Sequence, residues 1–463
     1  MPARPARPAR RPAATRRRPP DPARRVAYDA LRAVHAADAY ANLVLASLLR
    51  ERGLTGRDAA FATELLAGTC RFQGSYDLII EAAAGRRLDS LQPAVVDLLR
   101  LGVHQVLAMR VPAHAAVAAT VDLAVSAVGE RVAGLVNAVL RRVAARTLDG
   151  WLADLSAGRE GYDALAIRTG HPRWVVEAYA DLLVGDELPA ALAADNVSPR
   201  TALAVRPGLL EVADLVAAGA EPTGWSPYGA TWTGDPGVLP AVREGRAGVQ
   251  DEGSQLVALG LARAAAPAGW WLDLCAGPGG KTALLAGLAA ADGSRVLATE
   301  IGPHRAQLVA QATRAYVASP AGRPPVVVAD GTRPALRPGS FTRVLADVPC
   351  TGLGALRRRP EVRWRRRPDD VEPLHALQLA LARTAADATR PGGILAYVTC
   401  SPHRRETSDV VEELLAERAD LALEDAAALL PEVADADRGP YLQLWPHRHR
   451  TDAMFAAYLR RVD

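Results

Sequence analysis

From Trp270 onward, short apolar runs alternate with stretches of helical periodicity, and this alternation constrains the fold more than any other feature of the chain. Short apolar runs bounded by turn residues are typical of buried strands, and strands that alternate with helices build a mostly parallel sheet. Residues 243–463 are therefore predicted to form a Rossmann-like α/β domain. The expected strands are Trp270–Leu274, Val296–Thr299, Val326–Ala329, Arg343–Ala346 and Ile394–Val398, with Leu442–Trp445 and Ala453–Arg460 as a final hairpin.

The N-terminal part of the chain has a helical pattern instead. In residues 23–148 apolar side chains recur at helical spacing, as in Arg25–Val34, Ala94–Val103 and Val117–Val143, the last with one break. Strand patterns are missing there, so we predict an all-α bundle. Residues 149–242 mix helical and extended patterns with several Pro and Gly residues, and we interpret them as a small linking subdomain.

Charge is distributed unevenly along the 463 residues. Residues 1–25 hold nine Arg and one acidic residue, Asp21, so they carry +8, and the rest of the chain carries 4 − 8 = −4. Residues 1–22 are rich in Arg, Pro and Ala and cannot bury a core, which predicts a disordered tail. Such a tail fits either an electrostatic arm for nucleic acid or a solubilising extension.

Hydropathy bears on the compartment. The chain is 49% hydrophobic but has no uninterrupted apolar run of bilayer length. The charged N-terminus is not followed by the apolar core of a signal peptide. We therefore expect a cytoplasmic monomer that does not enter a membrane.

Lys281 is the only lysine of the chain, and it directly follows the glycine turn Gly277–Gly280 after an expected strand. Every other long cation is Arg. Lys is a compact point charge whereas Arg is a planar fork, so a lone Lys beside such a turn suggests a site in which the fork does not fit. Glycines at the carboxyl end of a strand let the backbone approach a ligand closely.

Three ligand classes compete for this turn. A phosphate-binding P-loop requires Gly where the chain has Cys275, and a dinucleotide fingerprint requires Gly where it has Thr282. S-adenosyl-L-methionine carries no phosphate and requires acceptors for its ribose hydroxyls and adenine amine. Glu300 and Asp330 follow the second and third expected strands as such acceptors, and Asp347 follows the fourth. Because successive acids disfavour a polyanion and suit a sulfonium cation, we predict S-adenosyl-L-methionine as the cofactor.

Two of the four cysteines follow strands at the same expected edge of the sheet. Cys350 ends Asp347-Val-Pro-Cys after the fourth strand, and Cys400 lies in Thr-Cys-Ser-Pro after the fifth. The cysteines form no CxxC pair, which predicts no zinc site. A thiolate beside a methyl donor suits methylation of a pyrimidine at C5, because addition of sulfur to C6 makes C5 nucleophilic. A carboxyl group near N3 would stabilise developing charge, and a base would remove the C5 proton.

These motifs together resemble the RNA (cytosine-5) methyltransferase family, which has a class I S-adenosyl-L-methionine-dependent methyltransferase domain. The resemblance implies that Cys400 is the nucleophile and that Cys350 assists product release, whereas DNA cytosine methyltransferases use the Pro-Cys thiol as nucleophile. It also implies that Lys281 and Asp347 lie close to the reacting groups. The cofactor contacts that it implies are Cys275, Ala276, Gly277, Pro278, Gly279, Gly280, Lys281, Glu300, Asp330 and Asp347.

The helical part extends the resemblance. Val111–Val117 and Leu135–Val143 resemble the NusB-like RNA-binding domain, and this domain joined to such a methyltransferase is similar to the bacterial 16S ribosomal RNA methyltransferase B family, also called Sun or Fmu. Glu300 stands where that family often has Asp, and Thr407 where Asn is common. The implied activity is formation of 5-methylcytosine in 16S ribosomal RNA. The alternatives are a tRNA-directed cytosine-5 methyltransferase and a non-catalytic NusB-like RNA-binding or antitermination factor.

A run of seven arginines around Trp364 directly follows the Pro-Cys motif. Arginines contact phosphates and aromatic rings stack on bases, so this run is the first candidate for RNA binding, with a solvated helix end as the alternative. A second candidate surface lies on the helical domain. The predicted RNA contacts are Arg357, Arg358, Arg359, Arg363 and Trp364, with Arg141, Arg142 and Arg146 on the helical domain.

Overall fold

The computed structural model describes residues 20–462 apart from residues 320 and 334, and these fall into two compact units that divide after Ala157. The predicted tail, residues 1–22, lies almost wholly outside the described residues, and Pro22 already opens the first helix. Within the described part, no helix is both long enough and apolar enough to span a bilayer.

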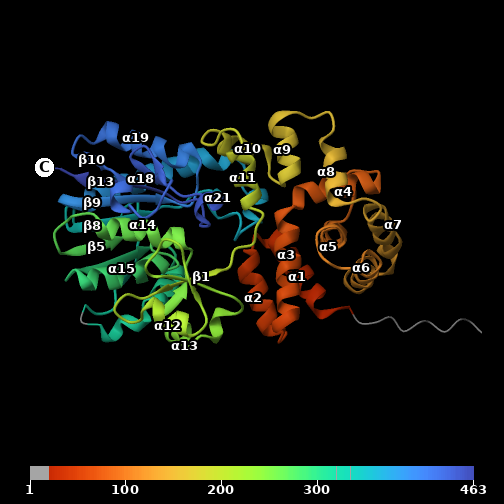
Figure 1. The fold of residues 1–463 in the computed structure, drawn as a ribbon, viewed down its shortest axis with the longest axis horizontal. Helices are drawn as coiled ribbons and strands as arrows, with labels where there is room; N and C mark the ends of the chain where they lie inside the picture. Colours follow the sequence, from red (N-terminus) through yellow and green to blue (C-terminus); the bar gives the residue numbers. More distant parts are fainter. Residues whose placement is uncertain (1–19, 320, 334, 463) are drawn as a thin grey trace, which may run out of the picture. The chain divides into compact units, whose positions relative to one another are not determined.

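The first unit is helical throughout its described residues, as predicted (Figure 1). Its first helix begins at Pro22 because the Asp21 carboxylate accepts a hydrogen bond from Arg24 N at 2.9 Å, and proline suits the first helical position. The unit continues past the predicted end at residue 148, since Trp151 packs into its single apolar core. Its helices are α1 (Pro22–Ala37), α2 (Ala41–Glu51), α3 (Gly56–Arg71), α4 (Gln73–Ala84), α5 (Pro93–Leu107), α6 (Ala113–Ala127), α7 (Ala133–Val143) and α8 (Leu148–Ser156).

The second unit opens with three short helices and a four-stranded antiparallel sheet that was not predicted as a sheet. The last of its strands pairs with the first across residue 242, the predicted boundary, and the unit includes the described residues from 158 onward. A separate linking subdomain at residues 149–242 therefore stays a prediction. The elements are α9 (Gly161–Thr169), α10 (Arg173–Ala180), α11 (Glu187–Ala194), β1 (Thr201–Val205), α12 (Val212–Ala217), β2 (Glu221–Pro222), β3 (Gly229–Trp232), α13 (Pro240–Glu244) and β4 (Ala247–Val249).

The main sheet of the second unit has nine strands in the order β11-β12-β13-β9-β8-β5-β6-β7, with β10 paired to β13. Strands β5 to β9 pair in parallel, whereas β13 runs antiparallel to β9. The five predicted parallel strands and the final hairpin are thus confirmed. The strands are β5 (Trp270–Asp273), β6 (Arg295–Glu300), β7 (Val326–Val328), β8 (Phe341–Asp347), β9 (Thr389–Thr399), β10 (Leu421–Glu424), β11 (Asp437–Arg438), β12 (Tyr441–Gln443) and β13 (Phe455–Arg461).

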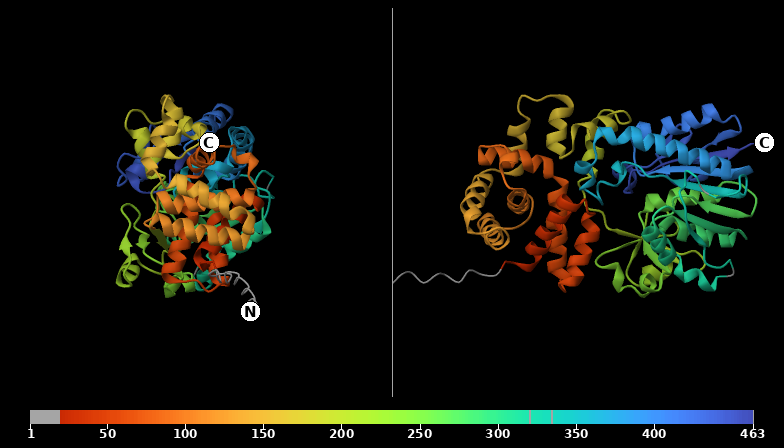
Figure 2. Two further views of the ribbon diagram at one scale, coloured as in Figure 1. Left: turned by 90° about the vertical axis from the view of Figure 1, so that its right-hand side faces the viewer. Right: turned by 180° about the vertical axis from the view of Figure 1, so that it is seen from behind.

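Helices cover both faces of this sheet (Figure 2). Successive side chains of a strand point to opposite faces, so Ile394 and Ala396 of β9 pack with α14 and α15, while Leu395 and Tyr397 pack with α18 and α19. Because β5, β6, β8 and β9 run parallel, their carboxyl ends meet at one edge of the sheet. The helices of this part are α14 (Glu252–Arg263), α15 (Gly280–Ala291), α16 (Pro303–Ala312), α17 (Val362–Arg365), α18 (Val371–Ala388), α19 (Ser408–Glu417), α20 (Ala426–Leu429) and α21 (Pro446–His449).

Candidate active site

The glycine turn between β5 and α15 leaves no room for side chains at two positions. A Cβ on Gly277 would lie 2.3 Å from Glu300 Oε2, and one on Gly279 would lie 2.7 Å from Val309 Cα. Gly279 also has a φ of +105°, in the region that favours glycine. The turn therefore requires glycine at position 279, and a side chain at position 277 would push the Glu300 and Arg305 side chains away.

Glu300, at the end of β6, is held against this turn. Its Oε2 accepts a hydrogen bond from Gly277 N at 2.9 Å, and its Oε1 accepts one from Gly302 N at 3.0 Å. Arg305 of α16 closes the arrangement, because its Nε lies 3.2 Å from Glu300 Oε2 and its Nη2 donates to Gly277 O at 2.7 Å. Arg305 was not predicted as a site residue, because nothing in the pattern of α16 distinguishes it from other surface arginines.

Asp273 is a second residue beside the glycine turn that was not predicted as a site residue. Asp273 is fully buried at the end of β5, and its carboxylate accepts a hydrogen bond from Thr282 Oγ1 at 2.7 Å. Burial raises the pKa of Asp273 to about 7. This contact ties the first turn of α15 to the preceding strand and so fixes the glycine turn. Burial also raises the pKa of Cys275, so its thiol stays protonated and forms part of the wall.

Asp330 follows β7, as predicted, at an exposed position. Val328 of β7 pairs with Glu300 of β6, so Asp330 lies at the same edge of the sheet as Glu300. Its Oδ1 accepts hydrogen bonds from Thr332 N at 2.9 Å and from Thr332 Oγ1 at 2.8 Å. These hydrogen bonds hold the pKa of Asp330 below its usual value, so the carboxylate is ionised at neutral pH.

Lys281, in the first turn of α15, pairs with Asp347 at the end of β8. Lys281 Nζ donates to Asp347 Oδ2 at 2.7 Å, and the lysine side chain is 12% exposed. Burial alone would lower the pKa of Lys281, but the attraction of the Asp347 carboxylate outweighs burial and raises it. The lysine therefore stays charged inside the site.

The sulfur atoms of Cys350 and Cys400 lie side by side, 3.4 Å apart. The hydrogen bond from Cys350 lowers the pKa of Cys400, and the positive charges of Lys281 and Arg359 act in the same direction. The same hydrogen bond, burial and the negative charge of Glu406 raise the pKa of Cys350. Cys400 is thus the more readily ionised of the two thiols, and the thiolate is the form that reacts as a nucleophile.

Arg357, which was predicted to contact RNA, is buried between two carboxylates. Arg357 is 8% exposed, and it donates from Nη2 to Asp251 Oδ2 at 2.8 Å and from Nε to Asp452 Oδ1 at 3.2 Å. The neighbouring Arg358 is partly exposed, but its Nε also donates to Asp452 at 2.9 Å. The two carboxylates lie 106 and 95 residues away in the chain, so the run of arginines does not reveal them.

Arg363 of α17, also predicted to contact RNA, has internal partners instead. Its side chain is fully buried, and its Nη1 donates to Gly170 O and to Asn196 Oδ1, both at 2.9 Å. Burial raises the pKa of the Asp195 carboxyl to about 7, although the positive charge of Arg363 acts to lower it. Arg363 therefore stabilises the fold of the second unit.

The other predicted RNA contacts retain exposed surface. Arg359 and Trp364 are half-buried, and Arg141, Arg142 and Arg146 are exposed on the helical unit. Two of these arginines also have partners within that unit: Arg142 Nη1 donates to the Ala83 carbonyl at 2.9 Å, and Arg146 pairs with Asp154. Their role in RNA binding stays a prediction.

Arg363→Ala is expected to destabilise the protein rather than weaken RNA binding selectively. Without this cation, the Gly170 carbonyl and Asn196 Oδ1 lose their buried donor, and the buried Asp195 carboxyl loses a neighbouring positive charge. The free energy of unfolding should therefore fall by about 3–5 kcal/mol. The exposed Arg367 provides a control, and Arg367→Ala should change stability by less than about 0.5 kcal/mol. Urea unfolding measures both variants, and equal stabilities would contradict the buried role of Arg363.

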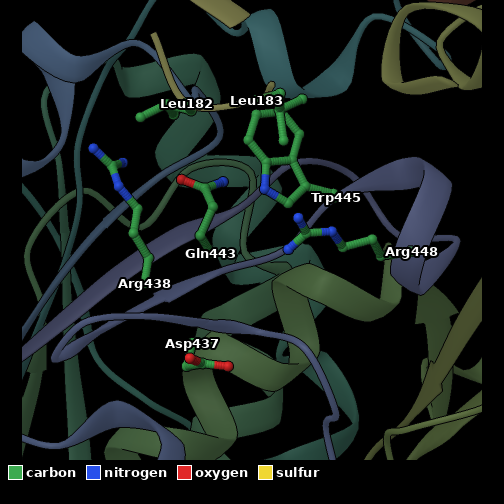
Figure 3. Close-up of a pocket in the computed structure, with 7 residues that line it drawn as sticks. All are labelled: Leu182, Leu183, Asp437, Arg438, Gln443, Trp445 and Arg448. Carbon is green, nitrogen blue, oxygen red and sulfur yellow. The ribbon is translucent and has the colours of Figure 1, made fainter. Parts of the chain in front are cut away.

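An open, polar cavity of about 180 Å³ is lined by none of the predicted site residues (Figure 3). Both of its arginines already have partners, since Arg448 pairs with Glu187 at 2.6 Å and Arg438 lies over the Phe455 ring at 6.0 Å. We therefore assign no ligand to it. Among the described residues, no cluster of three or more His, Cys, Asp or Glu side chains is arranged to hold a metal ion. The lining residues are Leu182, Leu183, Asp437, Arg438, Gln443, Trp445 and Arg448.

Two family models match the chain. Residues 261–460 match the model described as 16S rRNA methyltransferase RsmB/F, and residues 21–145 match the NusB family. The first range contains the glycine turn, Lys281 and both paired cysteines, whereas the second falls within the helical unit.

Relatives match along most of the chain. Putative methyltransferase Rv1407 of Mycobacterium tuberculosis is 52% identical over 96% of this chain and 98% of its own length. Ribosomal RNA small subunit methyltransferase B of Xanthomonas campestris pv. campestris is 32% identical over 88% of this chain and 90% of its own length.

Two solved structures resemble the chain in fold. The crystal structure of PH0851 has a TM-score of 0.77 at 21% identity and covers 95% of this chain and 98% of its own. The structure of NSun6 from Pyrococcus horikoshii with SFG has a TM-score of 0.53 at 17% identity and covers 63% of this chain and 98% of its own. At these identities the two structures support the fold alone.

Proposed function

The chain belongs to the 16S rRNA methyltransferase RsmB/F family, and from that premise we propose that it transfers a methyl group from S-adenosyl-L-methionine to C5 of a cytosine in 16S ribosomal RNA. The observation that carries this proposal is the 3.4 Å separation of the Cys350 and Cys400 sulfur atoms. A thiolate beside a second thiol suits both addition to a pyrimidine ring and release from it. If the substrate were tRNA, the match to the NusB family would have no explanation. If the protein were a non-catalytic RNA-binding factor, the paired cysteines would have none.

The residues around the glycine turn fit the cofactor. Glu300 Oε2 already accepts from Gly277 N and lies 3.2 Å from Arg305 Nε, whereas Oε1 accepts only from Gly302 N. A carboxylate oxygen has room for two donors, so Oε1 keeps capacity for a ribose hydroxyl. Asp330, ionised at the exposed end of β7, would accept from the adenine amine. When bound, the cofactor supplies a methyl group on a sulfonium centre, which is an electrophile.

In the first half of the reaction, Cys400 is the nucleophile. Its sulfur forms a bond to C6 of cytosine, and the electrons of the C5–C6 double bond make C5 able to attack the methyl group. The charge of Lys281 stabilises the thiolate before this addition. Asp347, oriented by Lys281, accepts a hydrogen bond from the exocyclic amine and holds the ring in place.

In the second half of the reaction, the product must leave Cys400. After methyl transfer, C5 carries both the new methyl group and a proton. A base takes that proton, and its electron pair restores the C5–C6 double bond while the C6–sulfur bond breaks and Cys400 leaves as the thiolate. Cys350, whose sulfur lies 3.4 Å from that of Cys400, is positioned to assist this release.

Bisulfite sequencing of ribosomal RNA tests the substrate and the product together. A cytosine of 16S RNA should resist conversion in cells that carry the gene and should be converted in cells that lack it. The purified protein with S-adenosyl-L-methionine should restore the resistance on unmodified 16S RNA. Protection of a tRNA cytosine instead would favour the tRNA-directed alternative, and unchanged patterns in both RNAs would contradict the proposal.

Lys281→Arg is expected to lower kcat about 10- to 100-fold with little change in stability or in KM for RNA. Lys281 Nζ is a compact ammonium group that lies 2.7 Å from Asp347 Oδ2, and the larger, planar guanidinium group of Arg would place its charge differently. A shift of about 1 Å in a catalytic group can lower the rate on the order of 100-fold. Steady-state methyl transfer measures the change. A wild-type kcat in this variant would show that the lone lysine has no special role.

A further inference from the structure

We propose that Glu406 is a positioning residue that clamps the Cys350 and Cys400 loops together and keeps the shared proton on Cys350. The inference rests on the proposed function, because it explains how two cysteines in one site take different roles. It assigns to Glu406 no contact with RNA or cofactor.

Glu406 lies where one carboxylate reaches both cysteine loops. It ends the short turn Arg404–Glu406, six residues after Cys400, and its side chain is fully buried. A buried carboxylate requires hydrogen-bond donors that replace water, and removal of such a group leaves those donors unsatisfied. The identity of its donors therefore shows what it holds.

The donors come from the residues directly after the two cysteines. Thr351, which follows Cys350, donates from its backbone N to Glu406 Oε1 at 2.7 Å and from its hydroxyl to Glu406 Oε2. Ser401, which follows Cys400, donates from Oγ to Glu406 Oε2 at 2.6 Å. Hydrogen bonds to an ionised acceptor are the stronger class, so this carboxylate pins both loops at once.

Further contacts fix the carboxylate itself. Gln378 of α18 donates from Nε2 to Glu406 Oε1 at 3.2 Å, and the Tyr397 hydroxyl donates to the Glu406 backbone carbonyl at 2.9 Å. The Gln378 side chain also donates to Pro349 O at 2.8 Å, immediately before Cys350. Glu406 is thus held by α18 and β9 while it holds the two loops.

The charge of Glu406 separates the roles of the two thiols. Glu406 accepts two hydrogen bonds from Thr351, next to Cys350, but only one from Ser401, next to Cys400. Its negative charge opposes ionisation of Cys350, while Lys281 and Arg359 favour ionisation of Cys400. A negative charge near one member of a hydrogen-bonded pair keeps the proton on that member. Lys281, Arg359 and the buried carboxylate therefore act together to make Cys400 the thiol that ionises first.

The test uses the full-length protein without RNA, so that it does not depend on the methylation reaction. Iodoacetamide alkylation of each cysteine is followed against pH by peptide mass spectrometry, and a short bifunctional thiol reagent reports whether the two sulfur atoms stay close. In the wild type, Cys400 should be alkylated at lower pH than Cys350, and the two should cross-link.

Two substitutions separate charge from geometry. Glu406→Gln removes the charge but keeps a side chain that can hydrogen-bond to Thr351 and Ser401. Their hydroxyls can accept a hydrogen bond from the new amide instead of donating one. The ratio of Cys400 to Cys350 alkylation should fall about tenfold in it, with cross-linking retained. Glu406→Ala removes the clamp, so the cross-link yield should fall severalfold. With RNA and S-adenosyl-L-methionine, Glu406→Gln should lower kcat and leave KM for the cofactor unchanged.

Glu252→Gln is the matched control. Glu252 is also a buried carboxylate, and its Oε1 accepts hydrogen bonds from Trp225 N at 2.6 Å and from Ser226 N at 2.7 Å. The Glu252→Gln variant should have the wild-type ratio of Cys400 to Cys350 alkylation and the wild-type cross-link yield. If Glu406→Ala does not fold, Ser401→Ala removes one donor from the clamp and should give a smaller loss of cross-linking.

The outcomes separate this inference from the proposed function. A folded Glu406→Gln with the wild-type alkylation ratio would overturn the role of Glu406 and leave the assignment of Cys400 standing. A wild-type protein in which Cys350 is alkylated before Cys400 would instead overturn the nucleophile assignment itself.

Discussion

Cys400→Ala should abolish methyl transfer to 16S RNA while the protein stays folded and still binds S-adenosyl-L-methionine. Without the thiolate, C5 of cytosine remains a poor nucleophile, and loss of an enzymatic nucleophile lowers kcat by a factor on the order of 10⁴ or more. The glycine turn, Glu300 and Lys281 are untouched by this change. Transfer of a labelled methyl group measures the rate, and calorimetric titration with the cofactor measures the binding.

Cys70→Ala is the control for this result. Cys70 is a buried thiol of α3 in the helical unit and belongs to neither cysteine loop. Its removal tests whether the loss of any buried thiol affects turnover, and activity should stay near that of the wild type. Substantial methyl transfer by Cys400→Ala would contradict the assignment of the nucleophile.

Cys350→Ala should trap the protein as a covalent complex with its RNA. In this variant Cys400 still forms its bond to C6 and C5 still receives the methyl group, but the group that assists release is missing. The adduct should therefore accumulate while turnover falls strongly. Incubation with 16S RNA and S-adenosyl-L-methionine, followed by a denaturing gel, should show a shifted band that survives denaturant.

The double variant Cys350→Ala/Cys400→Ala identifies the bond in that band. It should form no adduct, because no nucleophile remains at the site. A Cys350→Ala protein that turns over at the wild-type rate without a shifted band would contradict the product-release role of Cys350.

The fold of the second unit was predictable where its signal is local. Strands such as β5 and β8 are short buried runs that directly precede turns, and their alternation with helices determines the parallel order. The four-stranded sheet was missed because its strands do not alternate with long helices as β5 to β9 do, and β2 (Glu221–Pro222) has only 2 residues and β4 (Ala247–Val249) only 3. Runs of that length carry no period, and only tertiary pairing defines them.

Those parts of the candidate site that lie in short sequence motifs were predictable. The glycine turn and the two cysteines each follow a strand, so the parallel sheet brings them to one edge. Residues that act through long-range contacts were not predictable: Thr351 and Glu406 are 55 residues apart, and Arg357 reaches its carboxylates over longer separations. An arginine run has the same composition whether its members face phosphate or buried carboxylates, so composition cannot distinguish surface from core.

The central claim is that Cys400 forms a covalent bond with a cytosine of 16S RNA beside the Cys350 thiol. The most direct test incubates the wild-type protein and S-adenosyl-L-methionine with 16S RNA that contains 5-fluorocytidine, whose fluorine cannot leave C5 as a proton does. Mass spectrometry of the digested adduct should then find the methylated nucleotide on the peptide that contains Cys400. A nucleotide attached at Cys350 or at another residue would contradict the account. So would the absence of any adduct when the same protein preparation methylates C5 of cytosine in ordinary 16S RNA.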